Sequence, residues 1–410
     1  MRILFFSIAK PICLQKNNKY NGGGWIESVI DELSKKKDFS LGYAYVDNNI
    51  KKTEHQQVTY YSLSPAKRCL IRDISVLFGG NYQEIEKTYW KSYIDQMQNV
   101  INDFHPDIIH IWGSEREFGL IAKECDIPVI LHIQGIMNPY LNAFMPSGVS
   151  WEDLYRNINP IKGIHARLKH YAWLRHCYRE REIIKSIKYY LGRTEWDKRV
   201  THILNPTAEY YYCSEILRSV FYEEGVRNIP ATLEIVTTIS SPLYKGFDLV
   251  LKTAQIMKEV MNLDFNWKVF GNINPSYTEH KVGISCKDVN VSLMGVADAN
   301  QLKNEILNCT VYFHPSYIDN SPNSICEAQI LGSTVIACNV GGVSSLIKDD
   351  ETGYLIPAND PYQAAFLIKT LFNDECQNKN IGKKAHKIAS QRHNKNSIIK
   401  DLTDIYRKII

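Results

Sequence analysis

The strongest constraint on the fold is a series of short, uninterrupted apolar segments, each followed by a stretch with helical spacing. In the first half of the chain these segments include residues 3–8, 108–112 and 129–133. A strand that is apolar at every position is buried on both faces, as in a parallel sheet that is covered by helices. The first half is therefore predicted to be an α/β unit with a doubly wound parallel sheet.

The same alternation restarts in the second half, with further predicted strands at residues 232–239, 267–271, 311–314 and 334–339. Two such halves predict two Rossmann-like domains that face each other across a cleft. Prolines at positions 206 and 230 interrupt the pattern between them. We expect an N-terminal domain at 1–205, a C-terminal domain at 206–385, and a terminal helix at 386–410 that packs back on the first domain. Ligands of such sheets bind outside the carboxyl ends of the strands.

Composition excludes several classes of protein. The 48 Lys and Arg residues against 44 Asp and Glu give a net charge of +4, too small to indicate a dedicated nucleic-acid binder. No apolar run reaches the ~18 residues of a spanning helix. Residues 1–10 have a short apolar core with no cleavage site after it, which favours a buried strand over a signal peptide. The ten cysteines include no CxxC pair, so no zinc or redox motif is supported, and a cytoplasmic location is expected.

The densest group of candidate residues lies between positions 311 and 346. Asp319 follows an apolar strand, Glu327 lies eight residues later at the start of a helix, and Gly341 and Gly342 follow the next strand. A carboxylate and a phosphate are both favoured at a helix N-terminus. Spacing alone does not establish a ligand site, because Asp319 is also explained as an ordinary turn residue and Glu327 as an ordinary acid at a helix start.

The order of these elements resembles the retaining glycosyltransferases of family four, also called glycosyl transferases group 1, which have the GT-B fold. Their signature is a Glu, seven residues, Glu-Ala, a few residues, a glycine, and a strand that ends in Gly-Gly. Asp319, Glu327-Ala328, Gly332 and Gly341-Gly342 stand at these places. Lys245-Gly246 resembles the Lys-Gly phosphate element of the family. The resemblance is strong over residues 232–370 and looser before them.

The resemblance implies a role for each matched residue. Glu327 would accept hydrogen bonds from the ribose hydroxyls of a nucleotide, and Lys245 would neutralise the donor diphosphate. Asp319 would lie beside the transferred sugar. As a residue over a ligand cleft, Lys245 is expected to have little structural partner. The catalytic candidates are Asp319, Glu327 and Lys245, and the further donor-binding candidates are Gly22, Gly23, Gly24, Gly295, Asn323 and Ser324. The family needs no metal in general, and the sequence has no Asp-x-Asp element.

Several positions depart from the family pattern, among them Asp319 in place of the first Glu and Val343-Ser344-Ser345 where the Gly-Gly segment usually continues to a Glu. Ser240 stands where the family usually has an arginine, and Gln134 stands where it often has a histidine. His132 is then interpreted as a core residue. Arg193 is either a surface arginine or the source of the missing positive charge, so Gln134 and Arg193 are the acceptor-side candidates. The departures keep two alternatives open, namely an inactive sugar-nucleotide binder and a non-hydrolysing sugar-nucleotide epimerase.

A basic stretch at residues 162–193 carries nine Lys or Arg residues against two Glu, with aromatic residues between them. Such a stretch is typical either of a solvated face or of a surface that lies on anionic lipid. The resemblance favours a hexosyltransferase that moves sugar from a nucleotide-diphospho-sugar to a glycan or lipid-linked acceptor. We expect it in bacterial surface polysaccharide biosynthesis, with no cofactor and possible peripheral contact with the inner face of the membrane.

Overall fold

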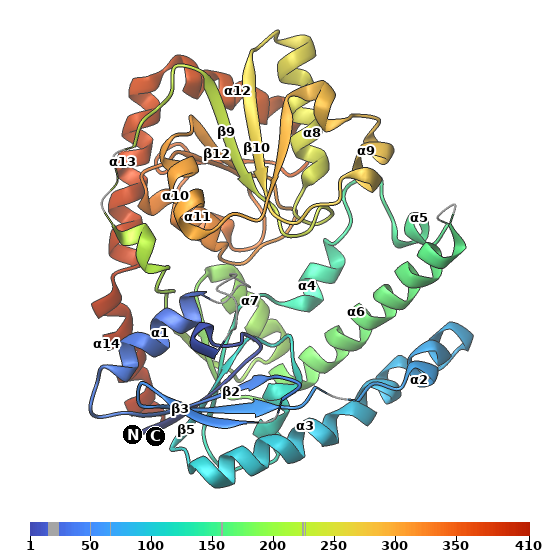
Figure 1. Cartoon of the computed structure of the whole chain (residues 1–410), viewed down its shortest axis with the longest axis vertical. Helices are drawn as coiled ribbons and strands as arrows, with labels where there is room; N and C mark the ends of the chain where they lie inside the picture. The colour runs from blue at the N-terminus through green and yellow to red at the C-terminus, as the bar shows by residue number, and fades with distance from the viewer. Residues whose placement is uncertain (15–23, 50, 66, 157–158, 224, 226) are drawn as a thin grey trace. The chain divides into compact units, whose positions relative to one another are not determined.

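In a computed structural model, which describes all residues except 15–23, 50, 66, 157–158, 224 and 226, the chain divides into two α/β units (Figure 1). The first unit comprises Met1–Asn142, Val149–Ile216 and Lys395–Ile410, and the second comprises Ala143–Gly148 and Leu217–Asn394. Each unit contains one sheet of mainly parallel strands with helices on it. The predicted fold class, two Rossmann-like parallel-sheet domains, is confirmed.

The first unit is built on an eight-stranded sheet in the order β3-β4-β2-β1-β5-β6-β7-β8. All neighbouring strands pair in parallel except β3 and β4, which form an antiparallel hairpin at one edge. The strands are β1 Arg2–Ser7, β2 Ser40–Val46, β3 Lys52–His55, β4 Val58–Leu63, β5 Ile108–Trp112, β6 Val129–His132, β7 Tyr189–Gly192 and β8 Glu209–Tyr212. The middle strands β5 and β6 are buried at every position, as their continuous apolar sequences predict.

The helices of the first unit begin and end at residues suited to those positions. Asn81 caps α3 by accepting hydrogen bonds from two backbone amides, and His105 ends it in the left-handed conformation before a proline. Asn159 caps the long helix α6, with Pro160 in its first turn. The helices are α1 Gly24–Ser34, α2 Leu70–Ile74, α3 Tyr82–Phe104, α4 Met137–Asn142, α5 Trp151–Tyr155, α6 Pro160–Ser186, α7 Glu195–Leu204 and α14 Lys395–Ile409, with 3₁₀ turns η1 Ile12–Leu14, η2 Ser75–Phe78 and η3 Glu117–Lys123.

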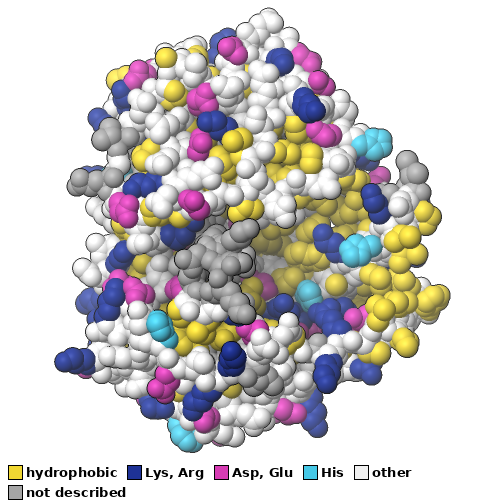
Figure 2. All heavy atoms as spheres, viewed as in Figure 1, with side chains coloured by type: hydrophobic (Ala, Val, Ile, Leu, Met, Phe, Trp, Pro, Cys, Tyr) yellow, Lys and Arg dark blue, Asp and Glu magenta, His cyan; other side chains and the backbone are white. Residues whose placement is uncertain are grey.

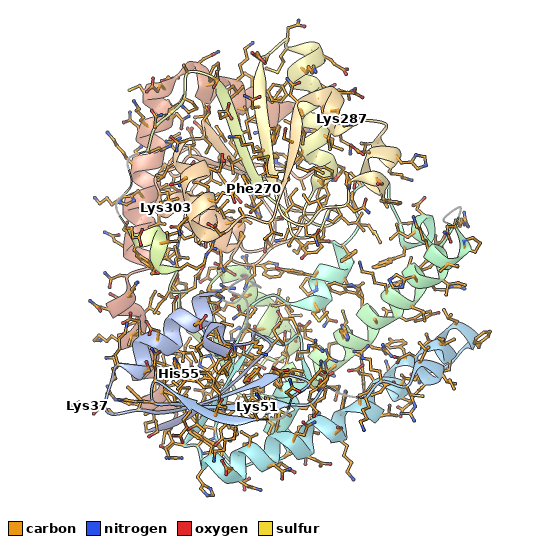
Figure 3. The ribbon with its side chains drawn as sticks, in the orientation of Figure 1. Lys37, Lys51, His55, Phe270, Lys287 and Lys303 are labelled. Atoms are coloured by element: carbon orange, nitrogen blue, oxygen red, sulfur yellow. The ribbon has the colours of Figure 1, made fainter. Side chains whose placement is uncertain are left out.

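The second unit has a six-stranded, fully parallel sheet in the order β11-β10-β9-β12-β13-β14. Phe270, at the carboxyl end of β10, is buried in the core that α10 covers (Figure 3). The strands are β9 Leu233–Thr238, β10 Phe265–Phe270, β11 Val291–Gly295, β12 Val311–His314, β13 Val335–Cys338 and β14 Tyr354–Ile356. The helices are α8 Phe247–Gln255, α9 Ser276–Val282, α10 Ala299–Leu307, α11 Asn323–Ile330, α12 Pro361–Asn373 and α13 Glu375–Arg392, with shorter turns η4 Ser219–Tyr222, η5 Ile256–Val260, η6 Cys286–Val289 and η7 Val343–Ser345.

The boundary between the units lies after Ile216 and not at residue 205, as the sequence predicted. The tyrosine-rich segment that follows residue 205 forms β8, which pairs with β7 and belongs to the first sheet. Asn205 holds this turn inside the unit, because its side-chain amide donates to the carbonyls of Ile184 and Ile187 at 2.9 and 2.8 Å. The proline at 206 is therefore a turn within the first domain.

The C-terminal segment also differs from the prediction in where it begins. Helix α13 stays in the second unit up to Asn394, and the return to the first unit starts at Lys395 rather than at residue 386. Within the first unit Tyr406 of α14 is fully buried, and its hydroxyl lies 2.5 Å from Nδ1 of His110 on β5. The last helix is therefore part of the hydrophobic core of the first unit.

Candidate functional site

The loops that follow β9, β12 and β13 meet at the carboxyl edge of the second sheet. The backbone amide of Gly342, after β13, donates to the carbonyl of Asp319 at 2.9 Å. The amide of Tyr317 donates to the carbonyl of Tyr244 at 2.8 Å, which joins the loop after β12 to the loop after β9. The predicted catalytic residues Asp319 and Lys245 are thus brought together, although 74 positions separate them in the sequence.

The centre of this edge is a buried ionic cluster. Asp319 accepts hydrogen bonds from the ammonium of Lys245 and, at 3.2 Å, from Nε2 of His314 at the end of β12. Burial opposes the charge of Asp319, but the two partners outweigh it and hold the pKa of its carboxyl well below the usual range. Burial also disfavours the charge of Lys245, and Asp319 offsets this and raises the pKa of the lysine. The expectation that Lys245 has little structural partner is therefore wrong.

His314 was not among the candidates found in the sequence. Burial lowers the pKa of His314, so the ring is neutral and carries its proton on Nε2 to donate to Asp319. The opposite nitrogen, Nδ1, is buried with no hydrogen-bond partner in the described part of the chain. The only sequence signal for this role was the position of His314 at the end of an apolar strand, where a buried histidine needs a polar partner.

Gly341 is required for the close approach of these loops. Its φ of +53° is in the left-handed region, and a Cβ there would lie 2.0 Å from the carbonyl oxygen of Asp319. We expect Gly341→Ala to combine strain of about 1–2 kcal/mol with displacement of the Asp319 loop. Gly283→Ala is the matched control, because φ is +71° and nothing lies within 4 Å of its Cβ position. Chemical denaturation should show the larger loss for Gly341→Ala, and equal losses would contradict this account.

Glu327 is buried in the middle of α11, and a guanidinium that the sequence did not indicate binds it. Nε and Nη2 of Arg218 donate to its two carboxylate oxygens at 2.9 and 2.8 Å in a bidentate pair. Arg218 also lies over the ring of Phe221, with 4.7 Å from the guanidinium carbon to the ring centroid. A carboxylate offers about four acceptor positions, of which this pair uses two. Because Arg218 precedes Glu327 by 109 residues, no local spacing could have revealed it.

The other donor-side candidates are divided between the second unit, the first unit and the residues that the structure does not describe. Asn323 begins α11, and its buried Oδ1 has no partner among the residues that the structure describes. Gly295 ends β11 and is exposed, as is Ser240 after β9. Ser324 is the second residue of α11, and Gly24 is the first residue of α1 in the first unit, whereas Gly22 and Gly23 fall outside the described part of the chain.

The acceptor-side candidates lie at the carboxyl edge of the first sheet. Arg193 follows β7 and is 5% exposed, so the alternative of a surface arginine is wrong. Its Nη2 donates to the carbonyl of Gln134 at 3.1 Å, and its Nη1 lies 3.7 Å from Glu215. His132 is buried in β6 and stacks on Trp112 with centroids 4.8 Å apart, as expected for a core histidine. Arg193 and Gln134 therefore form one polar group.

Glu115 is a candidate at this edge that sequence reasoning missed. It lies in the loop after β5, and its Oε1 accepts a hydrogen bond of 3.4 Å from the amide of Gly135. Burial and the nearby Glu180 carboxylate raise the pKa of Glu115 to about 7, although Arg193 opposes the shift. Glu180 is fully buried and accepts from Ser114 at 2.6 Å. A carboxyl that titrates near neutral pH at a strand end is suited to proton transfer or to binding a hydroxyl.

Comparison with known proteins finds one family model that matches the second unit. Residues 226–388 match the family model for glycosyl transferases group 1. The capsular polysaccharide biosynthesis glycosyltransferase CapM of Staphylococcus aureus is 22% identical over 55% of this chain and 53% of its own. The D-inositol 3-phosphate glycosyltransferase of Paenarthrobacter aurescens is 26% identical over 39% of this chain and 40% of its own. The chain thus spans about half, or less, of the length of these curated relatives.

Solved structures agree on the fold at low sequence identity. Sucrose-phosphate synthase from Thermosynechococcus elongatus superimposes with a TM-score of 0.73 at 15% identity, covering 100% of this chain and 98% of that one. The complex of Anabaena HepE with UDP-glucose gives 0.62 at 14% identity, covering 100% of both chains. WaaG, a glycosyltransferase involved in lipopolysaccharide biosynthesis, gives 0.62 at 13% identity, covering 98% and 99%. The chain therefore has the GT-B fold, and its residues 226–388 are similar to the glycosyl transferases group 1 family.

Proposed function

We propose that the chain is a retaining glycosyltransferase that moves a hexose from a nucleotide-diphospho-sugar to a glycan or lipid-linked acceptor. The observation that carries the proposal is the Lys245–Asp319–His314 cluster on the same sheet edge as Glu327, within the group 1 domain. CapM, a capsular polysaccharide glycosyltransferase, supports a place in bacterial surface polysaccharide assembly. The complex of HepE with UDP-glucose makes a UDP-sugar the first donor to test.

In the proposed reaction the bond between the sugar C1 and the diphosphate breaks, and an acceptor hydroxyl forms its bond to C1 on the same face. The acceptor proton passes to the leaving diphosphate, and the products are a nucleoside diphosphate and the extended acceptor. Lys245 would stabilise the growing negative charge on the diphosphate, which is a large contribution when donors are preorganised. Asp319, held as a carboxylate, would stabilise positive charge that develops on the sugar ring. We propose that Lys245 stabilises the leaving diphosphate without a resident metal or cofactor.

The polar group at the first sheet edge would receive the acceptor. Gln134 and Arg193 offer an amide and a cation for glycan hydroxyls or a phosphate, and Glu115 offers a carboxyl that is half protonated near neutral pH. In the second unit, Ser240 is exposed and stands at the place of the family arginine, so Lys245 is the remaining cation that the family resemblance predicts for the diphosphate. We place the enzyme in the cytoplasm, where nucleotide-sugars are the donors, at the inner face of the membrane.

The test of the proposal is the effect of Glu327→Gln on donor affinity. Glutamine keeps the size of the side chain but loses the charge that accepts from two hydroxyls, so UDP-sugar binding should weaken by about 1.5–3 kcal/mol, or roughly 10–100-fold. Isothermal titration calorimetry on the folded variant measures this. The matched control is Glu305→Gln, because Glu305 pairs with Lys268 at 2.9 Å on a half-exposed surface of the same unit.

The outcomes separate the candidate functions. Release of nucleoside diphosphate only when an acceptor is present supports transfer, and sugar interconversion without release supports an epimerase. Donor binding with no turnover on any acceptor would identify an inactive binder. Unchanged donor affinity in Glu327→Gln would show that the carboxylate serves only to hold Arg218.

A further inference from the structure

Five apolar side chains on one flank of the first unit are unusually exposed. They come from the start of α2, from the end of η2 and from the first turns of α6 in the first unit. The five residues are Leu70, Ile71, Phe78, Ile161 and Ile164, with exposures of 69%, 83%, 86%, 77% and 52%. We call these five residues the flank surface. Figure 2 shows hydrophobic side chains gathered on the side where Figure 1 places α2, α5 and the start of α6. Soluble proteins rarely leave several large apolar groups in water without a partner.

The charges around the flank surface are almost all positive. Exposed basic residues accompany the apolar ones in the same two segments; they are Lys67, Arg68, Arg72, Lys162, Arg167 and Lys169. Within residues 67–78 and 159–170 the one acidic side chain is Asp73, which is bound to Arg175. Of the acids on the neighbouring helix α5, Glu152 lies 3.8 Å from Arg156, and Asp153 closes the capping box at Ser150.

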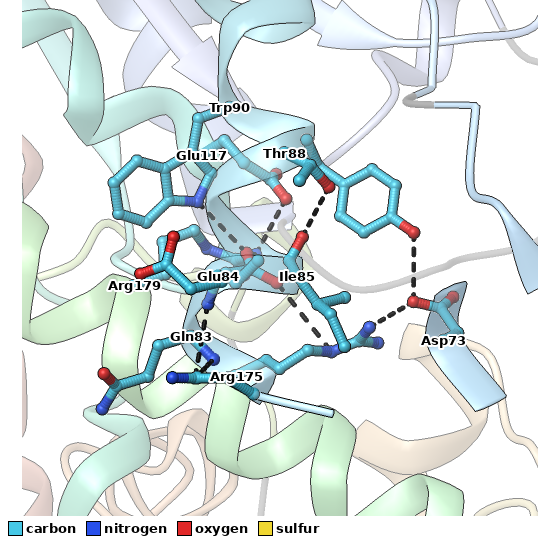
Figure 4. A network of polar contacts seen from close by, with 12 residues as sticks. Asp73, Gln83, Glu84, Ile85, Thr88, Trp90, Glu117, Arg175 and Arg179 are labelled. Atoms are coloured by element: carbon cyan, nitrogen blue, oxygen red, sulfur yellow. Dashed lines mark hydrogen bonds and ion pairs between the residues drawn. The ribbon is translucent and has the colours of Figure 1, made fainter. Parts of the chain in front are cut away.

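A buried ionic network holds these elements together (Figure 4). Arg175 binds Asp73 of α2, while Arg179 binds Glu86 of α3 at 2.5 Å and Glu117 of η3 at 2.8 Å. In addition, Val76 of η2 belongs to an apolar cluster against which Leu168 and Tyr171 of α6 pack. The exposed apolar side chains therefore belong to elements that ion pairs and apolar packing hold in place within the first unit.

The same network corrects the predicted lipid-facing stretch at 162–193. Arg175, Arg179 and Arg193 are 4%, 1% and 5% exposed and are paired inside the unit, so they cannot meet a membrane. The exposed charges of this stretch are those at its two ends. The surface suited to lipid is consequently the start of α6, which the predicted stretch includes, together with α2 and η2, which the sequence did not indicate.

We infer that the flank surface inserts its apolar side chains into an anionic membrane while the surrounding lysines and arginines contact the lipid headgroups. A second copy of the chain is the weaker occupant, because a symmetric contact would bring the same six cations against each other. Amphipathic surfaces that combine large apolar side chains with Lys and Arg bind anionic bilayers in this way. The inference rests on the proposed function only in assuming that the acceptor is linked to a lipid of that membrane. Binding to vesicles requires neither donor nor acceptor. No described helix is long and apolar enough to cross the membrane.

The test is sedimentation of the full chain with vesicles of phosphatidylcholine alone or of phosphatidylcholine with about 30% phosphatidylglycerol, which gives a strongly negative surface. We expect binding to the anionic vesicles only, weakened by salt. Ile71→Ser with Phe78→Ser should reduce binding at least tenfold, and Lys162→Glu with Arg167→Glu should do the same. The controls are Ile203→Ser, which removes a 77% exposed apolar residue of the same unit, and Lys185→Glu at the far end of α6.

Equal binding by all four variants, or binding without dependence on lipid charge, would overturn the inference. So would a concentration-dependent dimer in sedimentation velocity that Phe78→Ser dissociates, because the flank surface would then be a contact between copies. Donor affinity, measured on the same variants, should stay unchanged. If donor binding fails in wild type while vesicle binding holds, the proposed function is wrong and the docking surface stands.

Discussion

Replacing Lys245 with methionine is expected to reduce sugar transfer at least 100-fold, the order of magnitude for loss of one preorganised charge donor. Methionine keeps the aliphatic stem but removes the ammonium that binds Asp319. The variant therefore loses the proposed contact with the diphosphate and leaves a buried carboxylate with His314 as its remaining strong partner. Steady-state kinetics with saturating acceptor measure the first effect.

The same variant should also be less stable, by about 1–3 kcal/mol. Breaking a fully buried pair costs about 3–5 kcal/mol, and less is expected here because 16% of the Lys245 side chain is exposed. In wild type the pKa of Asp319 lies below its unfolded value, so the carboxylate stabilises the fold above about pH 4 and this stabilisation is lost as the pH falls further. The difference between the two proteins should consequently shrink on acidification.

Lys348→Met is the matched control, because Lys348 is 70% exposed and pairs with Glu351 on the surface of the same unit. It should change neither activity nor unfolding by more than about 0.5 kcal/mol. If Lys245→Met keeps its turnover but melts well below wild type, Lys245 is a structural residue and the diphosphate site lies elsewhere.

The sequence indicated three candidates at the second sheet edge because they are close in the chain and match the family signature. Asp319, Glu327 and Gly341 lie within 23 positions of one another, and parallel strands bring their carboxyl ends to one edge. Arg218 and His314 were missed for different reasons. Arg218 reaches Glu327 from a segment 109 residues away, and His314 was hidden within a strand whose pattern indicates only burial. Long-range partners of buried charges leave no periodic signal.

The basic stretch shows a second limit of sequence reasoning. A run of charges predicts a charged helix but not which of its charges face solvent, because a buried cation is permitted wherever an anion meets it. In α6 the partners come from α2, α3 and η3, and each contributes an acid whose own sequence context is unremarkable. The predicted domain boundary was placed at residue 205 for the same reason. The segment that forms β8 is recognised as a strand of the first sheet only through its pairing with β7.

Arg179→Met should be the most destabilising of these substitutions. Arg179 is 1% exposed, and its guanidinium donates hydrogen bonds to Glu86, to Glu117 and to the carbonyl of Glu115, the last at 2.5 Å. Methionine fills similar space but leaves two buried carboxylates without their shared cation, a loss of about 3–5 kcal/mol. For a unit of this size that corresponds to a fall in Tm of roughly 10 °C.

Differential scanning calorimetry resolves this effect, with Lys185→Met as the control, since Lys185 lies on the same helix but is 62% exposed. A triple variant that also carries Glu86→Gln and Glu117→Gln should recover part of the loss, because no buried charge then remains unpaired. If Arg179→Met melts like wild type, the network does not brace α6 against α3 and η3. The flank surface would then have to rely on the packing of Val76 with Leu168 and Tyr171 alone.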